Sequence, residues 1–349
     1  MPDFHKLMRE TIEKRMRAIQ VLQYGNAEAL TTTEIPPLEP GDGEAQVQIA
    51  YAGVNFIDVY MRRGMYSNNR AYATSLPLTL GMEGAGIVTA VGPGVDGVVT
   101  GDRVAYCLSP GSYAEFAVVP AWKLVKLPRD ISLAIGAAIM VQGCTAHYLS
   151  HTLFPLASGQ ICLVHAGAGG VGQLLIQLAK MRGARVLATV GSEAKAEIAR
   201  QRGADEVILY RDTDFCQAVM AVTDGEGVEV VYESVGRETF DDSIRCLKHR
   251  GTCVLFGASS GAVTSINPQI LADAGSVFLT RPNLADYMAS GEEIAARAGT
   301  LFDALTRGKL EVTIDVKFLL ADAADAQRTL EARKTAGKLV LEVDATLDS

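Results

Sequence analysis

The distribution of apolar and polar positions divides the chain into stretches with different rhythms. From Met16 the first third alternates short apolar runs such as "RAIQVLQY", "EGAGIVTAVG" and "YAEFAVVP" with Gly, Pro and Asp, which is typical of a β-rich barrel or sandwich. From Leu133 an apolar, helix-like run leads into short apolar strands separated by amphipathic helices. This alternation predicts βαβ units and therefore a parallel, doubly wound sheet with helices on both faces.

The last part of the chain has the same mixture of strand and helix patterns as the first third. A long helical pattern is followed by the strand-like "TIDVKFLL", a helix over "DAADAQRTLEARK" and a final strand, "GKLVLEV". We therefore predict an α/β protein in which a βαβ block, residues 138–284, is inserted into a β-rich domain formed by residues 16–137 and 285–349. Residues 1–15 fall outside both patterns, and we expect either a short extra helix or a disordered arm there.

Composition and charge narrow the classes of function. The formal net charge of -8 and a pI near 5.3 argue against a nucleic-acid partner or an anionic membrane surface, since both require a basic face. No stretch approaches the roughly 18 uninterrupted apolar residues of a membrane span, and the charged N-terminus has no signal-peptide core, so we expect a cytoplasmic protein. The six cysteines include no C-x-x-C pair, which predicts reduced, mostly buried thiols.

Two stretches match G-x-G-x-x-G, the pattern of a loop that binds a dinucleotide pyrophosphate. In "VGPGVDG", residues Gly92–Gly97 lie between two strand-like runs, which predicts a turn. "HAGAGGVG" instead follows "QICLV" and leads into "QLLIQLAKMRG", so only this match offers a strand before it and a helix N-terminus after it. We predict that Gly167 permits the tight turn, Gly169 lets the backbone approach the pyrophosphate, and Gly172 lets the helix pack against the strand.

The end of the next predicted strand, "RVLATV", indicates which dinucleotide binds. NAD sites usually place Asp or Glu there, whereas this strand is followed by Gly191 and Ser192, with Lys195 one turn further on. Small residues leave room for a 2'-phosphate and the lysine supplies positive charge, so the pattern favours NADPH. Alternatives remain at each position: Glu193 could still reach the ribose, Ser192 could be only a helix N-cap, and Lys195 only a solvated side chain.

Several motifs together resemble a known family. In chain order they are "NFIDVYMRRGMY", "LGMEGAGIV", "GDRVAY", "HAGAGGVGQ", "YESVG" and "FGASSGAV". They resemble the zinc-independent, zeta-crystallin-like quinone oxidoreductases of the medium-chain dehydrogenase/reductase superfamily, from about Met16 to Val343. The resemblance implies a GroES-like barrel domain made from both chain ends, an inserted Rossmann domain, and an active-site cleft where the two meet. It also implies a homodimer, which we expect to pair Rossmann sheets through "GAVTSI" or "SVFLT".

The resemblance further implies a set of site residues. Asn55, Tyr60 and Tyr66 would lie near the nicotinamide and substrate as catalytic residues. The cofactor would contact Thr145, Gly167, Ala168, Gly169, Gly170, Val171, Gly172, Gly191, Ser192, Lys195, Tyr210, Ser234, Phe256, Ser259, Arg281 and Arg333. Of these, the 2'-phosphate would be surrounded by Gly191, Ser192, Lys195, Tyr210 and Arg333, and the nicotinamide would be lined by Phe256 and Ser259. From the sequence alone, Asn55 could also be a turn-forming amide and the tyrosines half-buried packing residues. Asp58 is expected to serve structure through local hydrogen bonds.

The sequence does not offer the ligands of a zinc site. Zinc-dependent relatives carry Cys at the position of Asn55 and His at the position of Met82, and neither replacement coordinates zinc well. The four-cysteine lobe of many such relatives has no counterpart. His147 and His151 in "HYLSH" have the spacing of zincin ligands, but Tyr148 stands where the catalytic Glu would be and no third ligand is evident. We therefore expect no metal site.

The chemistry that remains is hydride transfer to an acceptor that needs no Lewis acid. Quinones and conjugated enones accept hydride readily, and a tyrosine or amide can stabilise the phenolate or enolate that develops. We predict an NADPH-dependent quinone reductase. One alternative is an NADPH-dependent alkenal or enoyl double-bond reductase of the same fold. A second is a zinc alcohol dehydrogenase, which Asn55 and Met82 disfavour. A third is a non-catalytic, crystallin-like protein that binds NADPH or RNA, although the acidic net charge disfavours RNA binding.

Overall fold

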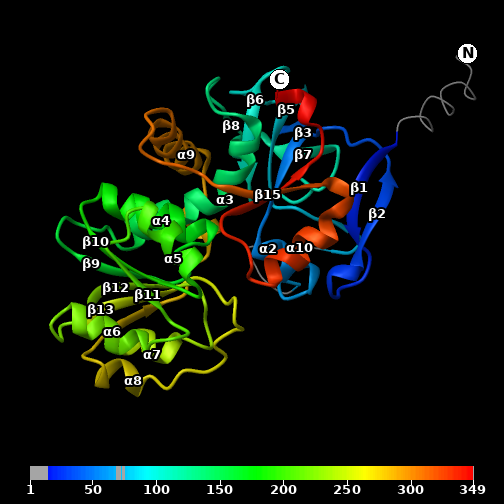
Figure 1. Cartoon of the computed structure of the whole chain (residues 1–349). Coiled ribbons are helices and arrows are strands. Elements are labelled where there is room, and N and C mark those ends of the chain that lie inside the picture. Colours follow the sequence, from blue (N-terminus) through cyan, green and yellow to red (C-terminus); the bar gives the residue numbers. More distant parts are fainter. Residues whose placement is uncertain (1–14, 68–71, 73–74, 349) are drawn as a thin grey trace, which may run out of the picture. The chain divides into compact units, whose positions relative to one another are not determined.

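The chain forms two compact units (Figure 1). A computed structural model describes residues 15–67, 72 and 75–348. The first unit takes in the chain up to Val141, residues 290–295 and the chain from Ile314 onward, and the second unit comprises residues 142–289 and 296–313. The helix or disordered arm predicted for residues 1–15 lies outside the described residues, except for Arg15.

The first unit is built on strands from both ends of the chain. Its larger sheet has seven strands in the order β15-β16-β3-β5-β6-β8, with β7 also paired to β3. A smaller sheet has the order β2-β1-β4. The strands are β1 (Met16–Val21), β2 (Leu30–Ile35), β3 (Glu44–Val54), β4 (Leu78–Thr79), β5 (Glu83–Val91), β6 (Arg103–Cys107), β7 (Phe116–Pro120), β8 (Val125–Lys126), β15 (Ile314–Leu319) and β16 (Lys338–Glu342).

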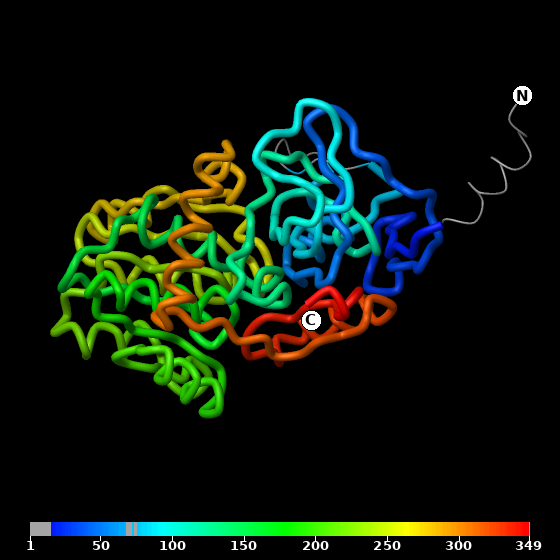
Figure 2. The backbone as a smooth tube through the Cα atoms, turned by 90° about the horizontal axis from the view of Figure 1, so that it is seen from above, coloured from blue at the N-terminus to red at the C-terminus, as the bar shows by residue number. Residues whose placement is uncertain are grey.

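The pairing of β16 with β3 is what joins the chain ends in one sheet. These strands are antiparallel, with Leu341 opposite Ala52. Figure 2 shows the red C-terminal segment alongside the blue N-terminal part of the chain. The C-terminal return of the chain to the β-rich domain, predicted from its texture, is therefore confirmed. The first glycine motif forms the turn between the antiparallel strands β5 and β6, as predicted, and its Gly94 and Gly97 have positive φ angles.

Helices of the first unit cover its larger sheet and fasten its ends together. They are α2 (Phe56–Arg62), α10 (Ala323–Glu331), the first turns of α3 (Leu133–Tyr148), and the short η1 (Ala27–Ala29), η2 (Ala121–Lys123), η5 (Leu320–Asp322) and η6 (Ala345–Asp348). The buried guanidinium of Arg62 on α2 donates to Gln327 Oε1 at 2.7 Å and contacts Glu331 at 3.0 Å, both on α10. This charge-assisted pairing holds α10 against α2.

The second unit contains the doubly wound sheet that the sequence predicts. Six strands lie in the order β11-β10-β9-β12-β13-β14, and every pairing is parallel. They are β9 (Ile161–Val164), β10 (Arg185–Val190), β11 (Glu206–Leu209), β12 (Val228–Glu233), β13 (Leu247–Leu255) and β14 (Phe278–Thr280). The helices are α4 (Gly170–Met181), α5 (Glu193–Gln201), α6 (Phe215–Val222), α7 (Phe240–Arg245), α8 (Gln269–Asp273), the short η4 (Leu284–Tyr287) and most of α9 (Gly291–Thr306). The strand order reverses between β9 and β12, which makes this pair the topological switch point.

The core of the second unit consists of strand side chains that are buried on both faces of the sheet. Leu163, Leu187, Val231 and Cys253 are fully enclosed, as a parallel sheet covered by helices requires. All six cysteines are free thiols, of which five are buried and Cys216 is half-buried.

The boundary between the units differs from the predicted one at α9. The sequence pattern predicts that everything from residue 285 onward belongs to the first unit, whereas residues 296–313 belong to the second. The buried guanidinium of Arg297 explains this, because it donates to Tyr287 O at 2.8 Å and to Thr152 Oγ1 at 2.9 Å. These acceptors fix the second half of α9 to the second unit.

One helical stretch is apolar and long enough to cross a membrane by length and composition. It is Leu133–Leu153, formed by α3 and the π-helical turn η3 (Leu149–Leu153) that continues it. However, 78% of its most apolar window is buried inside the protein, which is the property of a core helix.

Candidate functional site

The predicted cofactor residues of the second unit gather at one edge of the parallel sheet. Parallel strands end at the same edge, and ligands of open α/β sheets bind outside these carboxyl ends. The strands β9, β10, β12, β13 and β14 are followed, respectively, by the loop containing Gly167, and by Gly191, Ser234, Phe256 and Arg281. Residues that are far apart in the chain are therefore brought together by the topology of the sheet.

The second glycine motif forms the start of α4. The helix begins at Gly170 with Gly169 as its N-cap, and its first intrahelical bond runs from Gln173 N to Gly169 O at 2.9 Å. The N–H groups of Gly170, Val171 and Gly172 precede that bond and so have no acceptor within the helix. Three such donors at the positive end of a helix dipole are suited to bind an anion such as a pyrophosphate.

Each glycine of the motif has a distinct role in this geometry. A Cβ on Gly172 would lie 2.3 Å from Ala166 O, so the helix packs against the loop as predicted. A Cβ on Gly167 would lie 2.8 Å from Ala188 Cβ on β10. The left-handed residue of the turn is Ala166, with a φ of 52°. Gly167 lies inside the turn that Gly169 N closes on Ala166 O at 2.8 Å, and its missing side chain makes room for β10. A Cβ on Gly169 would meet only Ala166 at 3.1 Å or more, which leaves this face open.

The loops after β12 and β13 are held to each other and to the glycine loop. Ser234 Oγ donates to His165 O at 3.2 Å, and Ser259 N donates to Ser234 O at 3.3 Å. Phe256 N donates to Glu233 O at 2.9 Å. The structure thus brings Ser234, Phe256 and Ser259 together.

Arg281 and Thr145 lie in the same unit. Arg281 Nη1 donates to Leu255 O at 2.9 Å, which places its guanidinium beside the end of β13. Thr145 is buried on α3. Both belong to the second unit, as do all the other predicted cofactor residues except Arg333.

A buried polar network that the sequence analysis missed ties the strand ends together. The ring nitrogens of His165 lie 2.8 Å from Thr189 Oγ1 and 2.9 Å from Ser243 Oγ, and Ser243 also donates to Glu233 Oε2 at 2.5 Å. Burial lowers the pKa of His165, so its ring is neutral and can both donate and accept. The signal available in the sequence was the acidic end of the apolar run "VEVVYE", because a buried carboxylate needs partners.

The corner expected to hold the 2'-phosphate is defined by the missing side chain of Gly191. A Cβ there would lie 3.1 Å from Tyr210 Oη and 3.4 Å from Arg211 Nε. Arg211 is exposed and was missed by the sequence analysis, although a basic residue directly after the strand "EVILY" was visible. Tyr210 and Arg211 therefore lie beside Gly191 at this corner.

The contacts of Ser192 and Glu193 at the start of α5 bear on the alternative roles considered for these two residues. Ser192 occupies the N-cap position, but its side chain makes no capping hydrogen bond. Glu193 Oε1 pairs with Arg200 Nη1 at 2.6 Å. The acidic side chain that could have reached a ribose is therefore turned along the helix toward Arg200.

The first unit holds Asn55 in a buried, charged cluster. Asn55 is 5% exposed and lies between β3 and α2. Its Nδ2 donates to Glu83 Oε2 at 2.8 Å, and its Oδ1 accepts from Lys338 Nζ at 2.6 Å. Lys338 and Glu83 are themselves paired at 2.5 Å, and Glu83 Oε1 accepts from Val141 N at 2.6 Å. Opposite charges at its two ends fix the orientation of the Asn55 amide.

Asp58 makes one local hydrogen bond, as expected, and two with residues distant in the sequence. Its carboxylate accepts from Asn55 N at 2.8 Å, Met82 N at 3.0 Å and Tyr113 Oη at 3.2 Å. Burial raises the pKa of Asp58 to about 7. These contacts tie the start of α2 to the loop before β5.

The two predicted catalytic tyrosines belong to one aromatic cluster in the first unit. Tyr60 lies on α2 and Tyr66 in the turn after it, both half-buried, with ring centroids 5.9 Å apart and rings perpendicular. Tyr72 continues the cluster at 5.2 Å from Tyr66. Arg333 also lies in the first unit, directly after α10, with a φ of 55°.

Comparison with known proteins gives the family. Residues 41–129 match the alcohol dehydrogenase GroES-like domain and residues 170–294 the zinc-binding dehydrogenase family. The chain is 43% identical to a quinone oxidoreductase of Pseudomonas aeruginosa over 93% of this chain and 99% of that one. It is 40% identical to quinone oxidoreductase 1 of Escherichia coli over 93% and 98%. The chain belongs to the quinone oxidoreductase family of the medium-chain dehydrogenase/reductase superfamily.

Solved structures and a further relative agree with this assignment. An Escherichia coli quinone oxidoreductase complexed with NADPH has a TM-score of 0.90 and 39% identity, covering 94% of this chain and all of that one. A mycobacterial protein complexed with NADPH has a TM-score of 0.89 and 43% identity over the same shares. A 2-haloacrylate reductase of a Burkholderia species is 38% identical over 91% of this chain and 96% of that one.

The residues present do not fit the zinc that part of this superfamily carries. Lys338 Nζ lies 2.6 Å from Asn55 Oδ1, so a fixed positive charge already faces the oxygen that would bind the metal. A second cation there would be repelled. At the other candidate pair, Arg297 Nη1 faces His147 Nδ1 at 3.1 Å, and the rings of His147 and His151 stack at 4.3 Å. Neither place presents a set of donors suited to zinc.

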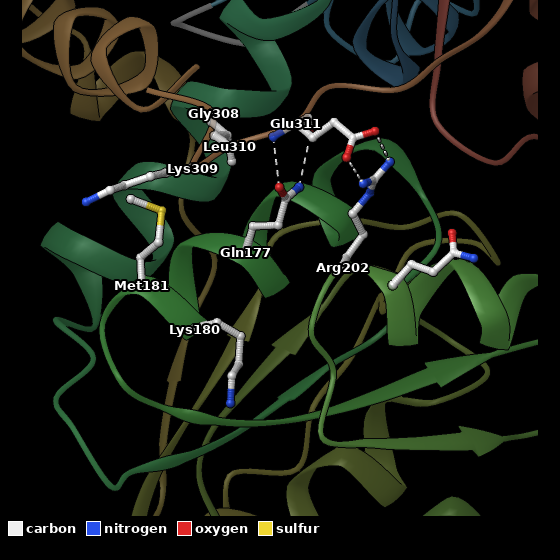
Figure 3. Close-up of a pocket in the computed structure, with 9 residues that line it drawn as sticks. Gln177, Lys180, Met181, Arg202, Gly308, Lys309, Leu310 and Glu311 are labelled. Atoms are coloured by element: carbon white, nitrogen blue, oxygen red, sulfur yellow. Dashed lines mark hydrogen bonds and ion pairs between the residues drawn. The ribbon is translucent and has the colours of Figure 1, made fainter. Parts of the chain in front are cut away.

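A pocket of about 440 Å³ lies elsewhere in the second unit (Figure 3). It is lined by residues near the end of α4, such as Met181, whereas the glycine loop lies at the helix start. Two of its three basic side chains are paired: Lys180 with Asp205 at 2.8 Å, and Arg202 with Glu311. This pocket therefore lies apart from the glycine loop.

The buried ion pair around Asn55 leads to a stability prediction. Replacing Lys338→Met leaves the Glu83 carboxylate buried without its counter-charge, which we expect to lower the free energy of unfolding by roughly 3–5 kcal/mol. Lys126→Met is the matched control, because Lys126 pairs with Asp102 at 2.9 Å but is 53% exposed. It should change the unfolding free energy little. Urea denaturation followed by circular dichroism measures both, and equal effects would contradict the predicted pairing.

Proposed function

We propose that this chain reduces quinones with NADPH, without a metal ion. The observation that carries the proposal is the Asn55 amide, held between Lys338 and Glu83 at the position where zinc-dependent relatives carry a ligand. A hydrogen-bonding amide suits acceptors that need no Lewis acid, and quinones are such acceptors. The names of relatives that are 40–43% identical over nearly their whole length support the same activity.

NADPH would be held along the carboxyl edge of the second unit's sheet. The N–H groups of Gly170, Val171 and Gly172 would bind its pyrophosphate. The 2'-phosphate would be bound by Ser192, Lys195, Tyr210 and Arg333 beside Gly191, with Arg211 as an addition. Thr145, Ala168, Ser234, Phe256, Ser259 and Arg281 would complete the cofactor site. When bound, NADPH supplies a hydride to the acceptor.

The residues of the first unit would orient the acceptor and stabilise the charge that develops on it. One N–H of the Asn55 amide is used by Glu83, and the other makes only a long contact, 3.5 Å to Gly53 O, so it can donate to an acceptor oxygen. The Lys338 ammonium polarises the amide from its oxygen side. Tyr60 and Tyr66 would act with Asn55 in orienting the acceptor. Donors that are oriented in advance stabilise a developing phenolate at little reorganisation cost.

Initial rates of NADPH oxidation test the proposed activity. An ortho-quinone, 1,4-benzoquinone, an α,β-unsaturated ketone and a 2-haloacrylate are compared as acceptors, with NADPH or NADH and with or without a chelator. We expect the quinones to give the highest kcat/KM, NADPH to be preferred, and the chelator to have no effect. The haloacrylate arm matters because a 2-haloacrylate reductase is among the relatives.

Other outcomes of these assays would change the proposal in defined ways. Turnover with the enone or haloacrylate alone would make the protein a double-bond reductase. NADPH binding without turnover of any acceptor would favour a non-catalytic role. Loss of activity with the chelator would contradict the metal-free site.

The NADPH preference predicts a selective effect of Lys195. Lys195→Met should raise the KM for NADPH about tenfold while leaving the KM for NADH within twofold, because only NADPH carries the phosphate whose charge-assisted bond is lost. Lys309→Met is the control, since Lys309 is exposed in the same unit but lies at the other pocket. If both dinucleotides were affected alike, Lys195 would not discriminate between them.

We also propose that the protein is a cytoplasmic homodimer. The uniformly free thiols support a reducing compartment. The strand β14 forms an edge of the six-stranded sheet, and Phe278 on it is 61% exposed. An open edge with a large exposed aromatic residue is a surface that a second copy would cover.

A charge on that edge should separate the subunits. We expect light scattering to give the wild type twice its 37.1 kDa chain mass and Phe278→Asp a monomeric mass. Val99→Asp, at an equally exposed apolar position of the first unit, should remain dimeric. A monomeric wild type, or a dimeric Phe278→Asp variant, would count against this interface.

A further inference from the structure

Gln173, in the first turns of α4, holds two consecutive carbonyl groups of the glycine loop. Its backbone N–H donates to Gly169 O at 2.9 Å, and its side-chain Nε2 donates to Ala168 O at 2.9 Å. The side chain is 2% exposed and Ala168 is 1% exposed, so water does not replace this contact. With both carbonyls turned toward Gln173, the loop presents N–H groups rather than oxygens to an anion.

The other end of the Gln173 amide is fixed by two donors. Its Oε1 accepts from Arg202 Nε at 3.0 Å and from Thr313 Oγ1 at 3.1 Å. Arg202 Nη2 also donates to Thr313 Oγ1 at 2.7 Å. Because the oxygen faces these donors, the NH₂ group is directed at Ala168, and the amide cannot flip without losing bonds at both ends.

Thr313 belongs to a short segment, Glu311–Thr313, through which the chain leaves the second unit before β15 begins at Ile314. This crossing segment is anchored at several points. Glu311 pairs with the Arg202 guanidinium, and its backbone N and O bond the Gln177 side chain at 2.8 Å and 3.0 Å (Figure 3). Gln173 therefore bonds both the glycine loop and the crossing segment.

We propose that Gln173 is a positioning residue that presets the pyrophosphate-binding loop and couples it to the crossing segment. The inference rests on the proposed binding of NADPH at this loop. Without the Gln173 donor, the Ala168 carbonyl is buried with one bond fewer, and the loop is free to reorient before each binding event. Binding must then supply the cost of ordering it, which weakens affinity for any dinucleotide with a pyrophosphate.

Gln173→Met tests the proposal, because methionine has a similar length and no hydrogen-bonding amide. We expect the Kd and KM for NADPH to rise five- to twentyfold and those for NADH to rise by the same factor, since both dinucleotides share the pyrophosphate. The kcat and the KM for the quinone should stay within twofold. Gln177→Leu is the matched control: it lies one turn further along α4 and bonds Glu311, but not the glycine loop, and should leave NADPH affinity within twofold.

A second pair of variants tests the coupling itself. Arg202→Met removes a donor that orients the Gln173 amide and should weaken NADPH binding two- to fivefold. In the Gln173→Met/Arg202→Met double variant it should add nothing further, because its effect passes through Gln173. In the wild type, NADPH should slow hydrogen exchange of peptides that contain residues 311–313, and in Gln173→Met this protection should be lost.

The outcomes separate this inference from the proposed function. A wild type that does not bind NADPH removes both. A wild type that binds NADPH while Gln173→Met binds it equally well overturns the inference alone. A loss confined to NADPH would assign the effect to the 2'-phosphate corner, and an equal loss in Gln177→Leu would assign it to general loosening of α4; either result overturns the positioning role.

Discussion

The proposed cofactor site depends on one close approach between the start of α4 and the loop that follows β9. A Cβ on Gly172 would lie 2.3 Å from Ala166 O, and one on Gly167 would lie 2.8 Å from Ala188 on β10. Removing both side chains lets the helix begin directly at the carboxyl edge of the sheet. The unpaired N–H groups of its first turn then lie where the loops after the neighbouring strands also end.

In the first unit, a buried ion pair orients a neutral hydrogen-bond donor, the Asn55 amide. Burying Lys338 and Glu83 costs desolvation energy that their mutual attraction roughly repays, so this pair is a weak explanation of stability by itself. Its structural consequence is clearer. The ammonium and the carboxylate leave the Asn55 amide one low-energy orientation, and the same ammonium keeps a divalent cation from its oxygen.

Features that depend on local sequence could be predicted, and contacts between distant residues could not. The parallel sheet follows from the rhythm of apolar runs, and "HAGAGGVG" was separated from "VGPGVDG" because the deciding strand and helix are adjacent in the chain. In contrast, Lys338 meets Asn55 across 283 residues and Thr313 meets Gln173 across 140, and no periodicity encodes such pairs. The unit to which the second half of α9 belongs was missed for the same reason, since a helical pattern does not reveal where Arg297 will find its acceptors.

A side-chain amide occupies a central position at each site, Asn55 in the first unit and Gln173 in the second, and the chemistry of the amide group explains why this residue type suits both. Each amide carries a donor and an acceptor without net charge, so partners of opposite character can fix it: Lys338 and Glu83 do this for Asn55, and Arg202 and Ala168 O do it for Gln173. A carboxylate in either place would repel a phosphate or a developing phenolate, and a lysine would lack the acceptor that orients it. Because an amide does not titrate, neither residue changes its own charge across the pH range in which Asp58, whose pKa is raised to about 7, changes its charge.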